Sequence, residues 1–417
     1  MTLALAPAHV APARVVDFDL FDDRRYAAAG GLHAGIFRLA EERERGIYWT
    51  PRNGGHWFLT DHELIFTAAR DPVLFSNAHM TLPPMPIELE PRLIPLTLDP
   101  PAHSSYRLPL MRAFSPGMVA ALEPAIRAHA IQLIAAIAND GRCDFVRAIS
   151  EPLPVIIFMR LMGMDPDRLG ECRGWAMDMI SNDDQRRADS FVNVGGMMRE
   201  LILARQAEPR DDLISRLVAS EVDGRLLTMD ELIDYCLLLF IAGLDTVANS
   251  LSFGMDHLAR DPALQERLRA EPERIADAVE EMLRRYGVVV VMRFITRDAI
   301  FGGVAIKAGE RVMLLLPAGN LDGQVFADPT RFDIARDANP HLSFNSGPHR
   351  CVGSHLARLE LRIFYEEWFR RMPAVRPDPA KSPTARAGLT LGLDSLPILW
   401  DAASTAWREK SAVNSAG

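Results

Sequence analysis

Hydrophobic residues recur with a helical period through the middle of the chain, from about residue 103 to residue 285. The clearest helix is predicted over 228–259, because Thr228 and Glu231 have the spacing of a capping box and the next proline is Pro262. A helix of about 30 residues is about 45 Å long. Its centre, residues 237–244, is apolar on every side, so we predict that it crosses the interior of the protein.

Shorter patterns at the two ends of the chain predict strands and loops. A helix over 31–45 is expected beside strands at 46–50 and 56–60, and further strands are expected at 288–292, 299–301 and 311–316. The proline-rich stretch 81–101 predicts a long irregular loop, and a helix over 351–371 precedes a final hairpin. We therefore expect a mainly α fold with a minor β region, in one domain spanning 1–417 whose first 17 residues form a loose arm.

Composition narrows the class of protein. With 48% hydrophobic residues the chain can build a large core, and its net charge of −9 lacks the basic excess that nucleic-acid binding requires. The four cysteines are too far apart for paired metal motifs or a disulfide framework, which favours a reducing compartment. Neither a secretory signal nor an apolar run long enough for a bilayer is apparent, so we expect a cytoplasmic protein without a membrane anchor.

The strongest chemical signal is the segment from Phe344 to Gly353, directly before the predicted helix. Glycines at 347 and 353 let the backbone turn tightly and approach a flat ligand, and Cys351 lies where a helix N-terminus favours the thiolate that binds metal. A lone cysteine is more often a small buried hydrophobe. Zinc binding with the nearby histidines is a second alternative, although the one-residue gap between His349 and Cys351 argues against it.

This segment resembles the haem-binding loop of the cytochrome P-450 family, whose pattern is Phe-x-x-Gly-x-x-x-Cys-x-Gly, with Asn345 replacing the usual glycine. Stretches at 52–57, 151–158 and 242–247 are most similar to the bacterial camphor 5-monooxygenase group. The resemblance implies a long central helix over a haem, a small sheet on the N-terminal side and C-terminal hairpins. It also implies that Cys351 is the proximal thiolate ligand of a haem b iron that activates O2.

The same resemblance assigns partners to the two haem propionates, which need cationic donors in a dry pocket. His103 and Arg107, spaced i and i+4 after Asp99-Pro100-Pro101, form one pair, and Arg293 and His349 complete the set. Taken singly, each of these residues is more often a surface or capping residue.

A further family motif is Glu281-x-x-Arg284, which implies a buried ion network with Arg331 of Pro329-Thr-Arg-Phe. An acid and a base at i and i+3 are otherwise most often a solvated helix face.

The central helix carries an acid, Asp245, in apolar surroundings, followed by Thr246. An unpaired buried carboxylate costs several kcal/mol, so Asp245 forms either a structural ion pair or part of a proton route. Thr246 has a hydroxyl that can bond its own i−4 carbonyl or a ligand. The resemblance implies that these two catalytic residues deliver protons to dioxygen.

The camphor enzymes anchor their ketone with a tyrosine, yet the loop 81–98 contains no tyrosine and the corresponding position falls near Pro91. A mostly apolar substrate pocket is expected from Leu238, Ile241, Ala242, Val289, Leu389 and Thr390. We therefore expect hydroxylation of an unactivated C–H bond in a small terpenoid or norisoprenoid that is camphor-like, ionone-like or cineole-like.

The chain contains no flavin or iron–sulfur motif, so electrons must come from another protein. The resemblance implies a [2Fe–2S] ferredoxin with an NADH-dependent reductase, docking near Arg107, Arg112 and Arg350 of a monomer. A peroxide-dependent haem enzyme and a non-catalytic haem or apolar-ligand binding protein of the same fold are the alternatives. Residues 81–98 and 181–193 are the segments expected to gate access.

Overall fold

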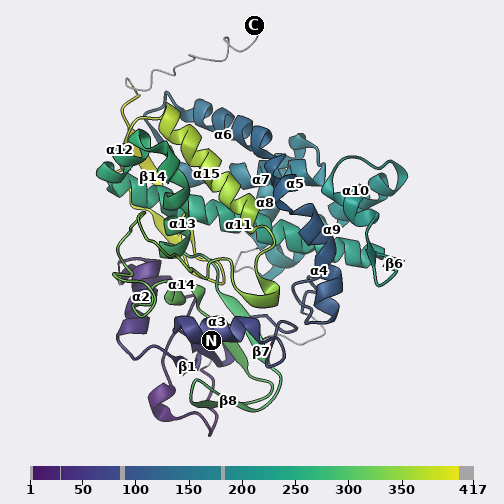
Figure 1. Cartoon of the computed structure of the whole chain (residues 1–417), viewed down its shortest axis with the longest axis vertical. Helices are drawn as coiled ribbons and strands as arrows, with labels where there is room; N and C mark the ends of the chain where they lie inside the picture. Colours follow the sequence, from purple (N-terminus) through teal and green to yellow (C-terminus); the bar gives the residue numbers. More distant parts are fainter. Residues whose placement is uncertain (1–2, 29, 85–89, 180–183, 403–417) are drawn as a thin grey trace.

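The computed structural model describes residues 3–28, 30–84, 90–179 and 184–402, and it is mainly helical (Figure 1). The helices are α1 (Asp23–Ala28), α2 (Leu32–Glu41), α3 (His62–Arg70), α4 (Ala102–Ala113), α5 (Pro116–Ala120), α6 (Glu123–Ile137), α7 (Pro152–Met162), α8 (Leu169–Met179), α9 (Asp184–Ala207), α10 (Leu213–Val218), α11 (Met229–Arg260), α12 (Pro262–Ala270), α13 (Ile275–Arg285), α14 (Leu316–Gly319) and α15 (Ser354–Arg371).

The strands form one larger sheet and several short ribbons. They are β1 (Ile47–Thr50), β2 (His56–Leu59), β3 (Phe75–Ser76), β4 (Arg142–Asp144), β5 (Glu221–Val222), β6 (Arg225–Leu226), β7 (Val291–Ile295), β8 (Ala299–Phe301), β9 (Val304–Ile306), β10 (Arg311–Leu314), β11 (Val375–Pro377), β12 (Thr384–Arg386), β13 (Gly392–Ser395) and β14 (Pro397–Trp400). The five-stranded sheet has the order β1-β2-β10-β7-β3, and only β2 and β10 are parallel within it. The sheet lies at one end of the molecule and most helices gather at the other (Figure 1).

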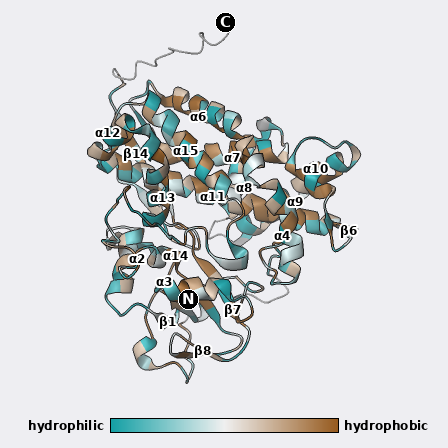
Figure 2. Ribbon diagram, viewed as in Figure 1, coloured by the Kyte–Doolittle hydropathy of each residue, from teal (hydrophilic) through white to brown (hydrophobic). Residues whose placement is uncertain are grey.

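The long helix α11 crosses the middle of the helical part, as its apolar centre predicts (Figures 1 and 2). The Thr228 side chain accepts a hydrogen bond from Glu231 N–H, and Glu231 in turn accepts one from Thr228 N–H, which completes the capping box. By length and composition α11 could span a membrane, but 56% of its apolar window is buried inside the protein. Contact with α7, α8, α9, α13 and α15 makes it the core helix of the fold.

The N-terminal segment differs from the loose arm that the sequence predicts. Ala4 N–H donates to the Pro51 carbonyl at 2.9 Å, Val15 forms a bridge with Trp49, and Val10 is buried. These contacts hold the segment against β1 at several points, although Leu3 and Leu5 are exposed.

The predicted strand at 288–292 is shifted toward the C-terminus. β7 begins at Val291, whereas residues 288–290 pair with a turn near the C-terminus through Leu391 N–H to Val288 O and Val290 N–H to Leu389 O. This pairing brings the segment before β7 against the hairpin formed by β12 and β13.

Candidate functional site

Cys351 lies in the loop before α15, where the sequence predicts it. Its N–H donates to the Phe344 carbonyl at 2.8 Å, which closes the loop. Gly347 has a φ of +69°, and a Cβ there would lie 2.6 Å from the Ala69 carbonyl oxygen, so only glycine fits against α3. Cys351 is exposed. Desolvation by surrounding protein atoms raises the pKa of its thiol, while the Gly353 N–H and the charge of Arg107 act in the opposite direction.

The four residues expected to bind propionates gather around this loop. The ring centroids of His103 and His349 are 4.2 Å apart. Desolvation is the main cause that lowers the pKa of His349, and the charges of Arg293 and Arg107 lower it further. Arg107 donates to the Arg350 carbonyl, and Arg293 is 1% exposed. Burial lowers the pKa of His103 to about 4 and that of Arg293 to about 10.

Buried nitrogens in this cluster have no hydrogen-bond partner: His103 Nε2, His349 Nε2 and Arg293 Nη2. Unsatisfied buried donors are costly, so a group that accepts from them is required. Two carboxylates that enter the pocket would satisfy them, and the donor set therefore fits a haem bound with its propionates on this side.

The centre of α11 carries the predicted acid and alcohol. Thr246 Oγ1 donates to the Ala242 carbonyl at 3.0 Å, as its i−4 spacing predicts. Asp245 Oδ1 accepts from Asn249 Nδ2 at 2.8 Å and from Arg386 Nη2 at 3.2 Å, whereas Oδ2 is buried without a partner. Asp245 is thus ion-paired through one oxygen and free at the other, and desolvation raises its pKa.

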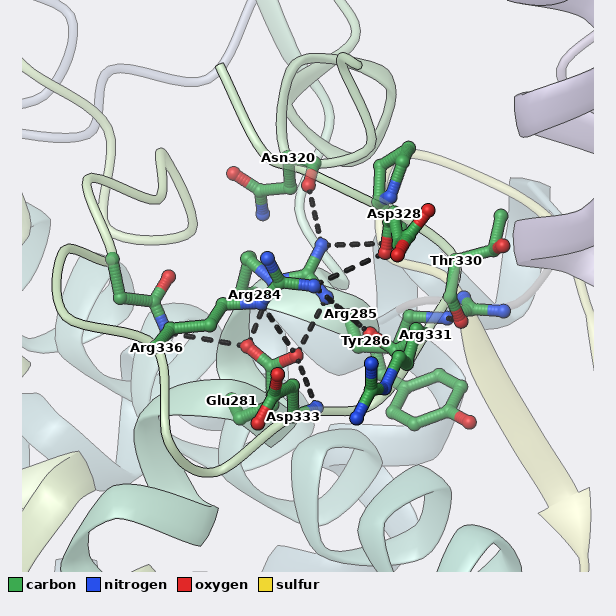
Figure 3. Close-up of polar contacts among 12 residues, drawn as sticks. Glu281, Arg284, Arg285, Tyr286, Asn320, Asp328, Thr330, Arg331, Asp333 and Arg336 are labelled. Carbon is green, nitrogen blue, oxygen red and sulfur yellow. Dashed lines mark hydrogen bonds and ion pairs between the residues drawn. The ribbon is translucent and has the colours of Figure 1, made fainter.

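Glu281 and Arg284 form a buried network, but its third member is not the residue that the sequence predicts (Figure 3). Arg284 donates to both carboxylate oxygens of Glu281, at 2.8 and 2.7 Å. The further cation on Glu281 is Arg336, whose Nε lies 3.1 Å from Oε1. Arg331 is exposed and contributes only its carbonyl, to Arg284 Nη2 at 3.0 Å. The motif residue therefore supplies backbone geometry, and a residue five positions later supplies the charge.

The expected substrate residues fall into two groups. In the first group a β-bridge joins Val289 and Thr390, and Leu389 precedes Thr390 in the chain. The second group consists of Leu238, Ile241 and Ala242, which all lie near the centre of α11. Ala242 is exposed although residues 239–240 and 247–249 of the same helix are buried, so space opens beside it. Thr390 is close enough to the Asp245 carboxylate to lower its pKa slightly against the effect of burial, which links the two groups.

A small cavity of about 30 Å³ lies where α7, α8 and α11 meet, and it is large enough for a water molecule. Ile241 and Asp245 line it from α11, and Glu151 and Arg173 line it from the other side. Asp245, whose Oδ2 has no hydrogen-bond partner among the described residues, is thus one of the residues that line this cavity.

Part of each segment expected to gate access, 85–89 and 181–183, lies outside the described residues. The described end of the first loop is fixed by ion pairs from Glu90 to Arg311 at 3.0 Å and from Arg92 to Asp234 at 2.6 Å. Within the described ranges no cluster of three or more His, Cys, Asp or Glu side chains could hold a metal ion, so the zinc alternative finds no support.

Two charged residues of the site, Arg336 and Arg386, were not predicted from the sequence. Both are separated from their acidic partners by long stretches of chain, 55 residues for Glu281 and 141 for Asp245. Neither lies in a motif, so no local signal marks them.

A cysteine loop, a set of buried nitrogens without acceptors and a long helix with an acid and an alcohol together have the features of a haem-thiolate site. The family model named "Cytochrome P450" matches residues 175–384. A steroid C26-monooxygenase of Mycobacterium tuberculosis is 37% identical over 395 residues, covering 92% of this chain and 97% of that protein. A linalool 8-monooxygenase of Pseudomonas putida is 33% identical over 345 residues, covering 78% and 85%.

Among solved structures, CYP101J2 matches with a TM-score of 0.88 and 33% identity over 96% of this chain and all of the other. The chain therefore belongs to the cytochrome P450 family, and the expected fold class is confirmed. As a member it is a monooxygenase whose haem iron is bound by a cysteine thiolate and which uses O2.

Proposed function

We propose that this enzyme hydroxylates an unactivated C–H bond of a small apolar terpenoid or norisoprenoid. The observation that carries the proposal is the set of unpartnered buried nitrogens around the Cys351 loop, because it supports a haem whose propionates accept from these nitrogens. Cys351 binds the iron, and His103, Arg107, Arg293 and His349 hold the propionates. The haem supplies dioxygen binding and O–O cleavage.

Asp245 and Thr246 move the protons that this reaction consumes. The Asp245 carboxyl carries a proton at Oδ2, the oxygen that is buried without a partner. Its raised pKa makes the protonated form accessible nearer neutral pH. Thr246 Oγ1 donates to the carbonyl of Ala242, an exposed residue of the same helix, and this bond holds the hydroxyl in place.

The substrate class follows from the side chains expected around the bound molecule. Leu238, Ile241, Val289 and Leu389 offer apolar surface and no charge, which favours a compact hydrocarbon skeleton. A relative is named for linalool, an isoprenoid, and another for a steroid, which supports an isoprenoid-derived substrate. Because the loop 81–98 contains no tyrosine, camphor itself is a weaker candidate.

The electron donor is a [2Fe–2S] ferredoxin that is reduced through an NADH-dependent reductase. Arg107 and Arg350 lie beside Cys351, and Arg112 is exposed on the same helix as Arg107. This positive surface on a chain of net charge −9 fits an acidic partner. All four cysteines are free, in keeping with a monomer in the reducing cytoplasm.

The test is optical titration of the ferric protein with camphor, 1,8-cineole, β-ionone and linalool. A shift from low to high spin with one of them, followed by product formed with NADH, reductase and ferredoxin, is the expected result. Haem-loaded protein that shows no shift with any of the four would refute the substrate class. Product formed equally well with hydrogen peroxide alone would favour the peroxide-dependent alternative.

A further inference from the structure

The two oxygens of Asp245 lie in different surroundings. Oδ1 accepts from Asn249 on the same helix and from Arg386 on the C-terminal hairpin, at 2.8 and 3.2 Å. Oδ2 is buried and has no hydrogen-bond partner among the residues that the structure describes. A carboxyl group that is held at one oxygen and free at the other has a fixed orientation and one site available for a mobile proton.

Arg386 is shared between two carboxylates. It ends β12, and its Nε donates to Asp394 Oδ1 on β13 at 3.1 Å, while Nη2 reaches Asp245. The side chain of Arg386 is 20% exposed, that of Asp245 14% and that of Asp394 41%. The more exposed acid is the better solvated, so the buried Asp245 gains more from the guanidinium.

The other charged groups near Asp245 are engaged elsewhere. Arg173 lines the same cavity but donates to Glu151 at 2.8 Å and to the Arg147 carbonyl at 3.3 Å. Glu151 also accepts from Arg147, at 2.8 Å. Among the described residues, Arg386 is therefore the cation in direct contact with Asp245.

The hairpin that carries Arg386 also carries expected substrate contacts. Residues 387–391 connect β12 to β13, and Leu389 and Thr390 lie in this turn, bridged to the segment before β7. The Asn249 side chain accepts from Leu393 N–H at 3.3 Å, which fixes the hairpin on α11 next to Asp245. A substrate that contacts residues 387–391 thus contacts the same hairpin whose Arg386 binds Asp245.

We propose that Arg386 is a positioning residue that holds Asp245 through Oδ1, leaves Oδ2 free for a proton and makes this arrangement depend on the turn that contacts substrate. The proposal rests on the proposed function, in which Asp245 supplies protons. Its consequence is that a well-fitting substrate keeps the acid aligned, whereas a poor fit loosens Arg386 and diverts reducing equivalents to hydrogen peroxide.

The positive charge of Arg386 determines the direction in which the pKa of Asp245 should change when Arg386 is replaced. Burial raises the pKa of Asp245 and Arg386 opposes that shift, so removing the guanidinium raises the pKa further. Removing Asp394 frees Arg386 for Asp245 and acts in the opposite direction. A merely structural arginine would also move this titration through its charge, but its removal would leave the share of electrons recovered as product unchanged.

The experiment compares Arg386→Gln, Arg386→Lys and Asp394→Asn in the haem-loaded ferric protein, with Asp245→Asn to assign the signal. Infrared difference spectra follow the protonation of the Asp245 carboxyl against pH, and turnover assays measure the share of NADH electrons recovered as hydroxylated product. Arg376→Gln is the matched control, because Arg376 is exposed on β11, which belongs to a different sheet from the hairpin that carries Arg386.

We expect the Asp245 midpoint to rise by about one pH unit in Arg386→Gln and to fall in Asp394→Asn, with Arg386→Lys close to the wild type. The product share should fall severalfold in Arg386→Gln and stay unchanged in Arg376→Gln. An unchanged Asp245 midpoint and an unchanged product share in Arg386→Gln would overturn the proposal. If that variant loses its haem, the Asp245 midpoints of Asp394→Asn and Arg386→Lys are the test instead, and a midpoint that does not fall in Asp394→Asn would overturn it. Wild-type protein that forms no product from any apolar ligand would instead refute the proposed function.

Discussion

At the level of single residues, Asn345 shows how the loop tolerates a departure from the family pattern. It has a φ of +59°, in the left-handed region, and its Oδ1 accepts from Ser346 N–H at 2.8 Å. Asparagine is among the few residues besides glycine that adopt this conformation readily. The substitution therefore preserves the path of the backbone toward Cys351.

A second residue-scale feature is Glu360, a carboxyl in the core that takes no part in the proposed chemistry. It is 3% exposed on α15, and its Oε2 has no partner. Burial raises its pKa to about 8, from 4.5. The unfolded chain thus loses this proton near pH 4.5 while the folded protein keeps it to about pH 8, so the fold loses stability as pH rises between these values.

We expect Glu360→Gln to leave the free energy of unfolding almost unchanged at pH 4.5. At pH 8 the free energy of unfolding of the variant should be higher than that of the wild type by about 4 kcal/mol. The check is the thermal midpoint of both proteins across that range. Glu221→Gln, at an exposed residue on β5, is the control and should show no such trend. Parallel curves for Glu360→Gln and wild type would contradict the assignment.

At the level of elements, the network around Glu281 fixes α13 to the irregular segment that leads to the cysteine loop. Arg284 donates to the carbonyls of Asn320, Pro329 and Arg331, at 2.9, 2.8 and 3.0 Å (Figure 3). Arg336 joins the same segment to Glu281 and is 10% exposed. These bonds satisfy backbone groups that have no strand or helix to pair with.

Removal of the Arg336 charge should therefore matter more than removal of the Arg331 charge. We expect Arg336→Gln to cost about 3 kcal/mol and to accelerate haem loss, because it leaves part of a buried carboxylate without its partner. Arg331→Gln keeps the carbonyl and should change stability by less than about 0.5 kcal/mol. Denaturation midpoints and haem transfer to an acceptor protein measure both effects, and equal losses would show that Arg331 belongs to the ion network after all.

At the level of the whole molecule, the charge distribution bears on electron delivery. The chain carries a net charge of −9, yet Arg107, Arg112 and Arg350 lie on α4 and the cysteine loop. A local positive surface on an acidic protein orients a charged partner, and salt weakens that attraction.

The kcat/KM for reduced ferredoxin should consequently fall as ionic strength increases. Arg112→Gln should lower it about fivefold at low salt, which corresponds to about 1 kcal/mol, with no change in the substrate-induced spin shift. Arg38→Gln, at an exposed residue of α2 far from α4 in Figure 1, serves as the control. A ferredoxin dependence that is insensitive to both salt and Arg112 would place the docking surface elsewhere.

Contacts between residues that are close along the chain could be predicted from the sequence. The capping box of α11, the Thr246 bond to Ala242 and the pairing of Glu281 with Arg284 all join residues within four positions of each other. The cysteine loop is equally local, because two glycines and the start of a helix specify it. Spacing along a helix or a turn fixes such geometry whatever surrounds it.

Contacts between side chains that are distant along the chain depend on the packing of the whole fold. Arg336 rather than Arg331 completes the Glu281 network, Arg386 pairs with Asp245, and His103 lies against His349. These contacts depend on how helices and hairpins pack, since burial forces a charged group to pair with whichever partner the packing brings within reach. The charged residues of a site can thus be identified from the sequence, but which of them pair with each other depends on the fold.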